Sequence, residues 1–341
     1  MKFGAMDHLD LSNGLPQADH FEDRLRLGEM FDAAGFYCFH VTEHHFTPLG
    51  GGSTPSVYLS ALAQRVKRMR VGTLVYALPA HHPLRLAEEI CVLDQLSRGR
   101  LDIGFGRGSV PEELAYMGVD TQKAREIYDE GLAVVEQALR DGHVNFEGKH
   151  FTFKDVPLHL RPYQKPMPPM WYGVHSTESA ERAARAKFNI VVNEDTDVSA
   201  KYIADFRRTR ASLGQTEPEP LIGLMRTIVV GETDEKALAL ADRAHDVFQK
   251  TFTWMHRRHG RVPQHWGLDT KFAELMKSER SFAGSPDSVF QFLENQIRTT
   301  GATYSVLRFS FGDQSFDEMR RSIELFTEKV MPRLEKALEP A

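Results

Sequence analysis

Short runs of apolar residues alternate with longer amphipathic segments along almost the whole chain. Buried parallel strands are typically continuous apolar runs and surface helices carry one apolar stripe, so this alternation indicates repeated βα units. Eight such units favour a single (β/α)8 TIM-type barrel over residues 1–341, rather than a doubly wound sheet with a second domain. The predicted strands are 3–6, 36–42, 71–78, 101–105, 170–174, 188–192, 221–230 and 304–309.

Capping residues bound the predicted helices between these strands. Gly35 ends a helix as a C-terminal cap, and Pro55 and Pro83 suit first helical turns. No linker-like change of composition interrupts the series, which again indicates one domain. The predicted helices are 21–34, one beginning near 55, 83–96, 123–140, 176–187, 199–213, one beginning near 233, 286–299 and 316–338.

Two excursions interrupt the alternation, one after the fourth strand and one after the seventh. Residues 143–168 place phenylalanines at alternating positions around Gly148, which predicts a hairpin. Residues 251–285 lose their periodicity and mix Trp254 and Trp266 with basic residues. A loop of this length is usually functional, so we expect a lid segment over a binding site, although a solvated basic face is the simpler alternative.

Composition narrows the class of protein. The 341 residues are 41% hydrophobic, enough for a large core, and the formal net charge of −5 gives no reason to expect a nucleic-acid partner. Cys38 and Cys91 lie in apolar patterns, as expected of buried thiols in a reducing compartment. Without a signal-like segment or an apolar run of membrane-spanning length, the expectation is a soluble cytoplasmic protein that uses no membrane.

The run Val41-Thr42-Glu43-His44-His45 stands where the second predicted strand ends, the place where barrel enzymes position their chemistry. It admits three interpretations. The carboxylate could cap a turn beside two incidental histidines, or the histidines could bind a metal, although neighbouring side chains diverge and no HxH or HExxH spacing is present. The third interpretation is an acid/base imidazole oriented by a carboxylate, and it is the one we favour, with no metal.

Two further strand ends suggest an anion site. Gly104-Phe105-Gly106-Arg107-Gly108 lacks the spacing of a dinucleotide fingerprint, but its glycines allow close approach of a flat ligand and Arg107 offers a fork for a phosphate. The alternative is an ordinary tight turn with a surface arginine. His175-Ser176-Thr177-Glu178-Ser179 begins a helix, where backbone N–H groups and hydroxyls attract anions, unless the serine is a plain cap.

Three stretches of the sequence resemble the luciferase-like flavin monooxygenases. They are VTEHHFTPLG, VGTLVYALPAHHPLRLAEEICVLDQLSRGRLDIGFGRG and GVHSTESAERAA, within a similarity that extends from Lys2 to the last helix. The resemblance implies a barrel, usually dimeric, that takes reduced FMN from a separate flavin reductase and uses O2 through a C4a-hydroperoxide. It implies monooxygenation of a small organic substrate.

The resemblance also assigns roles near the flavin ring. His44 matches the family's catalytic histidine and Glu43 a buried carboxylate near it, so we expect Glu43 to orient His44. Leu74 and Val75 match the strand under the ring, where family members can have a non-proline cis peptide bond. His45 is left without a role beyond bracing its loop.

The family's phosphate site is carried over in the same way. Arg107 matches the phosphate-binding arginine, and His175, Ser176 and Ser179 match the phosphate loop, in agreement with the anion site predicted from the residues alone. Gly106 stands where light-emitting subunits carry cysteine, which argues against light emission and would leave room for the ring.

Two other functions remain open on the same fold. One is a hydride-transfer oxidoreductase that uses the deazaflavin F420 without oxygen. The other is a non-catalytic flavin-binding accessory subunit, against which the joint presence of His44 and Arg107 argues.

Overall fold

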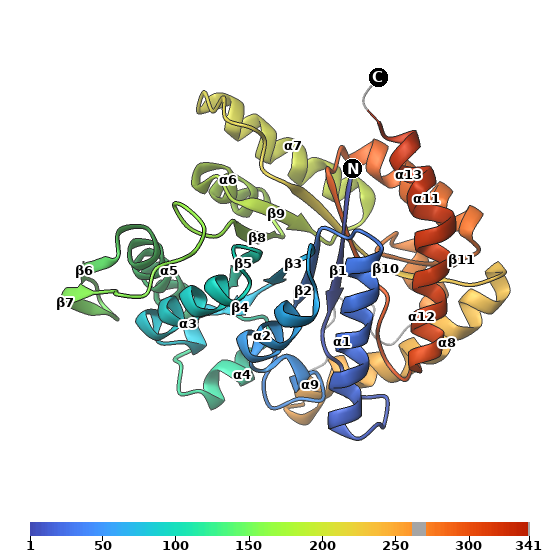
Figure 1. The fold of residues 1–341 in the computed structure, drawn as a ribbon, viewed down its shortest axis with the longest axis horizontal. Helices are drawn as coiled ribbons and strands as arrows, with labels where there is room; N and C mark the ends of the chain where they lie inside the picture. Colours follow the sequence, from blue (N-terminus) through green and yellow to red (C-terminus); the bar gives the residue numbers. More distant parts are fainter. Residues whose placement is uncertain (261–270, 340–341) are drawn as a thin grey trace.

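The computed structural model describes residues 1–260 and 271–339. Within this part, eight parallel strands pair in a closed ring, because β9 pairs with both β8 and β10 while β12 joins β10 to β1 (Figure 1). The predicted (β/α)8 barrel is confirmed. The ring consists of β1 (Lys2–Asp7), β2 (Cys38–Val41), β3 (Arg70–Thr73), β5 (Leu101–Gly106), β8 (Met170–Val174), β9 (Asn189–Val192), β10 (Ile222–Val230) and β12 (Tyr304–Arg308).

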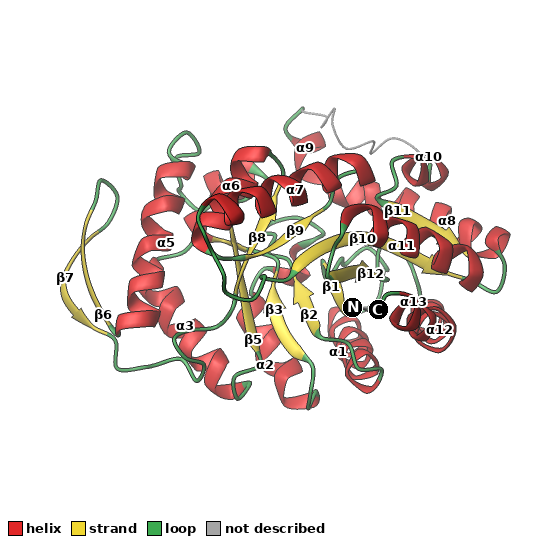
Figure 2. Cartoon of the chain, turned by 90° about the horizontal axis from the view of Figure 1, so that it is seen from above, coloured by secondary structure: helices red, strands yellow, loops and turns green. Residues whose placement is uncertain are grey.

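Helices surround the strands on the outside, as the view from above shows (Figure 2). Their apolar faces pack on the outward side chains of the strands in one large cluster, and α6 with α7 and α8 with α10 pack in two smaller ones. The helices are α1 (Gln17–Ala33), α2 (Pro55–Arg65), α3 (Pro83–Leu96), α4 (Pro111–Tyr116), α5 (Ala124–Asp141), α6 (Thr177–Ala186), α7 (Thr196–Ser212), α8 (Asp234–Phe252), α9 (Trp254–Arg258), α10 (Phe272–Lys277), α11 (Pro286–Thr300), α12 (Phe316–Leu325) and α13 (Met331–Ala337).

The structure departs from the predicted elements at four places. The third predicted strand is divided into β3 and β4 (Tyr76–Ala77), and the last helix is divided by a π-helical turn at Phe326–Val330. The short α4 was not predicted. Within the predicted lid 251–285, the described residues contain α9, α10 and β11 (Ser281–Gly284), a strand that pairs with the carboxyl-terminal half of β10. Short elements carry too few residues to show a period, which explains these differences.

The excursion after β5 contains two paired strands. β6 (His143–Glu147) and β7 (Thr152–Pro157) are antiparallel, and the amide of Gly148 donates to the carbonyl of Phe151 at their turn. The pair projects from the edge of the barrel beside α5, far from the other strands (Figure 1). It therefore contributes no side chain to the barrel interior.

A layer of large side chains fills the barrel near the amino ends of its strands. Tyr304 lies against Trp171, with ring centroids 5.2 Å apart, and its hydroxyl is 2.9 Å from Nε2 of His40. The indole N–H of Trp171 donates to Asp102 at 2.8 Å. Burial lowers the pKa of His40 to about 3, so this imidazole is neutral. Because this layer closes one end, ligands reach the interior only from the carboxyl ends of the strands.

Candidate active site

The strand register brings the carboxyl ends of β1, β2 and β3 together. Asp7 lies beside Val41, and Val41 lies beside Thr73. The residues that follow β1 and β2 therefore share one rim of the barrel, and the rings of His8 and His44 stack there with centroids 5.9 Å apart. We call this end of the barrel the mouth.

His44 is held at the mouth by a carboxylate from a distant part of the sequence. Its Nδ1 lies 3.1 Å from Oε1 of Glu113, which projects from α4, and both side chains are largely buried. A carboxylate on Nδ1 fixes the ring orientation and keeps the proton on that nitrogen, which leaves Nε2 for a ligand. The residue that orients His44 is therefore Glu113, which the sequence analysis did not identify.

The carboxylate of Glu43 forms no hydrogen bond or ion pair with His44 among the described residues, so the predicted orientation of His44 by Glu43 is wrong. Its oxygens accept from Nε2 of His45 at 2.7 Å, from Nε2 of His81 at 2.8 Å and from the amide of Ala77 at 2.8 Å. Burial acts to raise the pKa of Glu43, but these donors and the charge of His81 outweigh it and lower the pKa to about 2. The ionised carboxylate thus ties the loop after β2 to the segment after β4, and His45 is one of its donors.

The pKa of His81, in contrast, is raised. Burial alone would lower its pKa, but its hydrogen bond to Glu43 and the charge of that carboxylate raise the pKa above the ordinary value. Glu43 and the partly buried His81 therefore act as an ion pair at this end of the barrel.

Leu74 and Val75 lie between β3 and β4, and the peptide bond that joins them is cis, as the resemblance implied. Their side chains occupy space that glycines leave open. A Cβ atom on Gly106 would lie 2.4 Å from Cγ2 of Val75, and one on Gly104 would lie 3.1 Å from Cγ1 of Val75. Gly106 is therefore required by the close packing of Val75.

The predicted phosphate residues follow two neighbouring strands. Arg107 comes directly after β5, and His175 and Ser176 follow β8, whose Met170 and Trp171 pair with Ile103 and Gly104 of β5. The side chain of Arg107 is exposed, and within the described residues it makes no ion pair or hydrogen bond. It is free to reach an anion at this edge.

The start of α6 is a reciprocal cap. Ser176 Oγ accepts from the amide of Ser179, while Ser179 Oγ accepts from the amides of Ser176 at 2.9 Å and His175 at 3.0 Å. Two carboxylates lie near this helix start, Glu178 in its first turn and Glu194, which is 3.2 Å from Nδ1 of His175. The hydroxyls are therefore used within the cap, and the anion-binding capacity comes from the helix N-terminus and Arg107.

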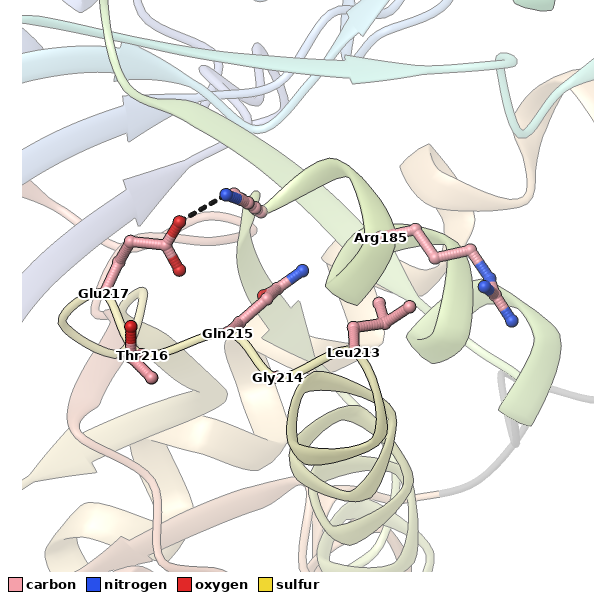
Figure 3. A pocket seen from close by; sticks show the side chains of 7 residues that line it. Arg185, Leu213, Gly214, Gln215, Thr216 and Glu217 are labelled. Carbon is pink, nitrogen blue, oxygen red and sulfur yellow. Dashed lines mark hydrogen bonds and ion pairs between the residues drawn. The ribbon is translucent and has the colours of Figure 1, made fainter.

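A groove on the surface of the molecule lies away from the mouth. It measures about 460 Å³ and lies where α6 and α7 end, between Lys187 and the turn at 213–217 (Figure 3). Glu217 and Lys187 form an ion pair across it. These helix ends lie at the amino ends of the strands, away from the mouth, so we do not assign the groove to the active site.

In residues 1–260 and 271–339, no cluster of three His, Cys, Asp or Glu side chains is arranged to hold a metal ion. No helix there combines the length and apolar character needed to cross a membrane.

A closed barrel with buried histidine–carboxylate pairs at the carboxyl ends of its strands has the architecture of an enzyme. The chain belongs to the luciferase-like monooxygenase family, which matches residues 1–304. The resemblance read from the sequence is confirmed, and the protein is an oxidoreductase of this flavin-dependent family.

Individual relatives cover nearly the whole chain. The uncharacterized protein y4wF of Sinorhizobium fredii is 36% identical over 336 residues, which make up 98% of this chain and 97% of the relative. The 4-hydroxyprotoasukamycin monooxygenase of Streptomyces nodosus subsp. asukaensis is 27% identical and covers 92% of this chain and 87% of its own length. The crystal structure of monooxygenase RslO1 from Streptomyces bottropensis superposes with a TM-score of 0.87 at 27% identity, over 98% and 99% of the two chains.

Two more distant structures share the fold alone. The oxygenating constituent of 3,6-diketocamphane monooxygenase from Pseudomonas putida, in complex with FMN, has a TM-score of 0.81 at 20% identity and covers 98% of both chains. The coenzyme F420-dependent tetrahydromethanopterin reductase from Methanopyrus kandleri has a TM-score of 0.71 at 19% identity and covers 98% of this chain and 99% of that one. The fold therefore accommodates either type of cofactor.

Proposed function

We propose that the protein is the oxygenase of a two-component system, which takes reduced FMN from a separate reductase and inserts an oxygen atom from O2 into a small organic substrate. Bound reduced FMN supplies the electrons that activate O2. The observation that carries the proposal is the buried His44–Glu113 pair at the mouth, beside the packed Leu74–Val75 segment.

The residues present fit an FMN molecule at the mouth. The Leu74–Val75 segment, packed against Gly104 and Gly106, would lie under the ring. Arg107 and the N-terminus of α6 would hold the phosphate, because one is an uncommitted cation and the other presents backbone donors. Glu178 and Glu194 oppose an anion there, but Arg280 lies 4.0 Å from Glu194 and offsets its charge.

His44 would move a proton at Nε2. Because Nδ1–H donates a hydrogen bond to Glu113, Nε2 is the nitrogen that remains to exchange a proton with a ligand. Glu43, with His45 and His81, would act indirectly by holding the loop that carries His44.

Exclusion of water is the other requirement, since reduced flavin in contact with water and O2 is oxidised without product. The proposed lid 251–285 contributes α9 to the rim, where the hydroxyl of Tyr116 lies 2.8 Å from Nε2 of His259. Tyr116 also packs edge-on against Phe46, with centroids 5.6 Å apart. Residues 261–270, including Trp266, lie outside the described residues.

We propose a cytoplasmic homodimer as the working form. Val57 on α2 and Val92 and Leu96 on α3 are 70%, 42% and 47% exposed, a large apolar exposure for neighbouring helices. Such a patch on two packed helices is a candidate subunit contact. We propose no nucleic-acid partner, because the formal net charge of the chain is −5.

Substrate panels with photoreduced FMN and O2, followed by mass spectrometry, test the proposal. We expect a product 16 mass units heavier from at least one organic compound. His44→Ala should keep FMN binding but lower oxygenation by about 10²-fold or more. Glu113→Gln should lower it less, because the imidazole remains and only its orientation is weakened.

Two outcomes would overturn the proposal, and a third would change the mechanism. Tight F420 binding without FMN binding would favour hydride transfer. Flavin binding without coupled O2 consumption on any substrate would favour an accessory subunit. Unchanged turnover in His44→Ala would remove His44 from the mechanism.

A further inference from the structure

A second polar group at the mouth has no part in the proposed flavin chemistry. Arg308 is the last residue of β12, and Tyr304 and Val306, which precede it by four and two positions, face the barrel interior. Because side chains alternate along a strand, Arg308 faces the interior as well, at the end where the barrel opens.

Arg308 lacks a direct carboxylate partner. In the described ranges no Asp or Glu oxygen forms an ion pair with it. Asp7 and Asp10 are the nearest carboxylates that act on it, but Asp7 is engaged by Ser310 and by Arg24, and Asp10 accepts from backbone amides. Burial lowers the pKa of Arg308 to about 10, so the guanidinium still carries its charge at neutral pH.

The guanidinium is nevertheless held in one orientation. Its Nε donates to Oγ1 of Thr227 at 3.0 Å, and its plane lies over Phe248 and Phe311, 4.3 Å and 5.4 Å from their ring centroids. Stacking on aromatic faces fixes the donor fork of an arginine without using its outer N–H groups. A partly buried cation arranged in this way is ready to bind an anion.

His8 holds the guanidinium from a second side. Nδ1 of His8 lies 3.4 Å from a terminal nitrogen of Arg308, and an arginine can only donate, so Nδ1 accepts and the proton stands on Nε2. Burial, Arg308 and His44 together hold the pKa of His8 well below its ordinary value, so the ring is neutral. Its Nε2–H has no hydrogen-bond partner among the described residues.

The walls around these donors are aromatic. Phe248 and Phe252 from the end of α8 lie edge-on to the ring of His8, at 5.7 Å and 6.2 Å. The His8 ring in turn stacks on His44. A ligand held by Arg308 would therefore place its apolar body between aromatic side chains and beside the proposed acid/base residue.

We infer that Arg308, Thr227 and His8 form a subsite for the carboxylate of the substrate, which is an aromatic or otherwise apolar acid. This inference rests on the proposed function, because it assigns the substrate class of the same mouth. The carboxylate would accept two parallel bonds from the outer N–H groups of the guanidinium, which Thr227 and His8 hold in place, while the position to be oxygenated lies toward His44.

Isothermal titration with matched acids and amides tests the inference without any turnover. The pairs are benzoate and benzamide, 3-phenylpropionate and its amide, and 1-naphthoate and its amide, measured on wild type, Arg308→Met, Arg308→Lys and Arg298→Met. Arg298 is an exposed control in α11, where it pairs with Glu294. Charge-assisted bonds are roughly twice as strong as neutral ones, so we expect at least one acid to bind about 10-fold tighter than its amide.

Arg308→Met should reduce that preference to about twofold or less, Arg308→Lys should keep part of it, and Arg298→Met should keep all of it. Lack of preference for the acid in every pair, or its survival in Arg308→Met, would overturn the inference. So would a loss of reduced-FMN binding in Arg308→Met with the acid preference intact. Failure of wild type to bind reduced FMN would instead contradict the proposed function, and the lysine variant keeps the test valid if the methionine variant does not fold.

Discussion

Replacement of Glu43 by glutamine tests whether this carboxylate holds the loop that carries His44. The carboxylate is buried and accepts from His45, His81 and the amide of Ala77. An amide in its place would lose the charge and turn a donor toward groups that already donate. The pKa of Glu43 is lowered from its ordinary value of 4.5 to about 2, which corresponds to about 3 kcal/mol of stabilisation at neutral pH. We expect Glu43→Gln to lose about 3 kcal/mol.

Urea unfolding followed by tryptophan fluorescence measures this loss. The sign follows from the direction of the pKa. A carboxyl whose pKa is lowered by folding stabilises the protein above pH 4.5 and loses that contribution as the pH falls toward 2. Wild type should therefore lose stability in this window and converge toward Glu43→Gln.

A surface carboxylate supplies the control. Glu22 pairs with Arg65 where both side chains are substantially exposed, so Glu22→Gln should cost less than about 1 kcal/mol. If Glu43→Gln is as stable as this control at pH 7, or if its stability falls in parallel with wild type below pH 4.5, the assignment of Glu43 as a structural carboxylate is refuted.

Three further predictions concern packing, the cofactor and assembly. Gly106→Ala should lower the free energy of unfolding in urea by about 1–3 kcal/mol, because its Cβ would meet Val75. Gly131→Ala, in α5 with ordinary contacts to Leu78, should raise it by up to about 1 kcal/mol. Equal stabilities of the two variants would contradict the packing argument. Arg107→Gln should weaken FMN binding by about 10-fold in fluorescence titration, and unchanged binding would place the phosphate elsewhere. The double variant Val57→Glu and Val92→Glu should be monomeric by light scattering if α2 and α3 form the dimer contact, and a persistent dimer would exclude this face.

The barrel could be predicted from the sequence because its evidence is distributed over the whole chain. Each long apolar run contributed one strand, so an error of a few residues at an end did not alter the count. The short elements were missed because six residues, as in Pro111–Tyr116, contain less than two helical turns. For the same reason α9, α10 and β11 were read as one aperiodic segment.

The site was predicted in part. His44 could be found because it lies three residues after the end of a strand, and the position of such a residue in a barrel depends on the local sequence. Its partner Glu113 could not, because 69 residues separate the two and only the closed sheet brings them together. A signal was present, since Pro111 followed by acidic residues is typical of a helix start. Adjacency in the sequence pointed instead to Glu43, whose side chain turns toward His45 and His81.

Arg308 was not among the residues predicted to form the site. Its importance depends on what surrounds it, namely the faces of Phe248 and Phe311 and the acceptor nitrogen of His8. These contacts join three distant segments of the chain, and no spacing in the sequence encodes them.

Anaerobic equilibrium titration of the purified protein with photoreduced FMN and with reduced F420, in parallel, tests the central claim most directly. The account predicts saturable binding of reduced FMN that Arg107→Gln weakens and His44→Ala leaves unchanged, with weak or undetectable binding of F420. Tight binding of F420 together with no binding of FMN would contradict it.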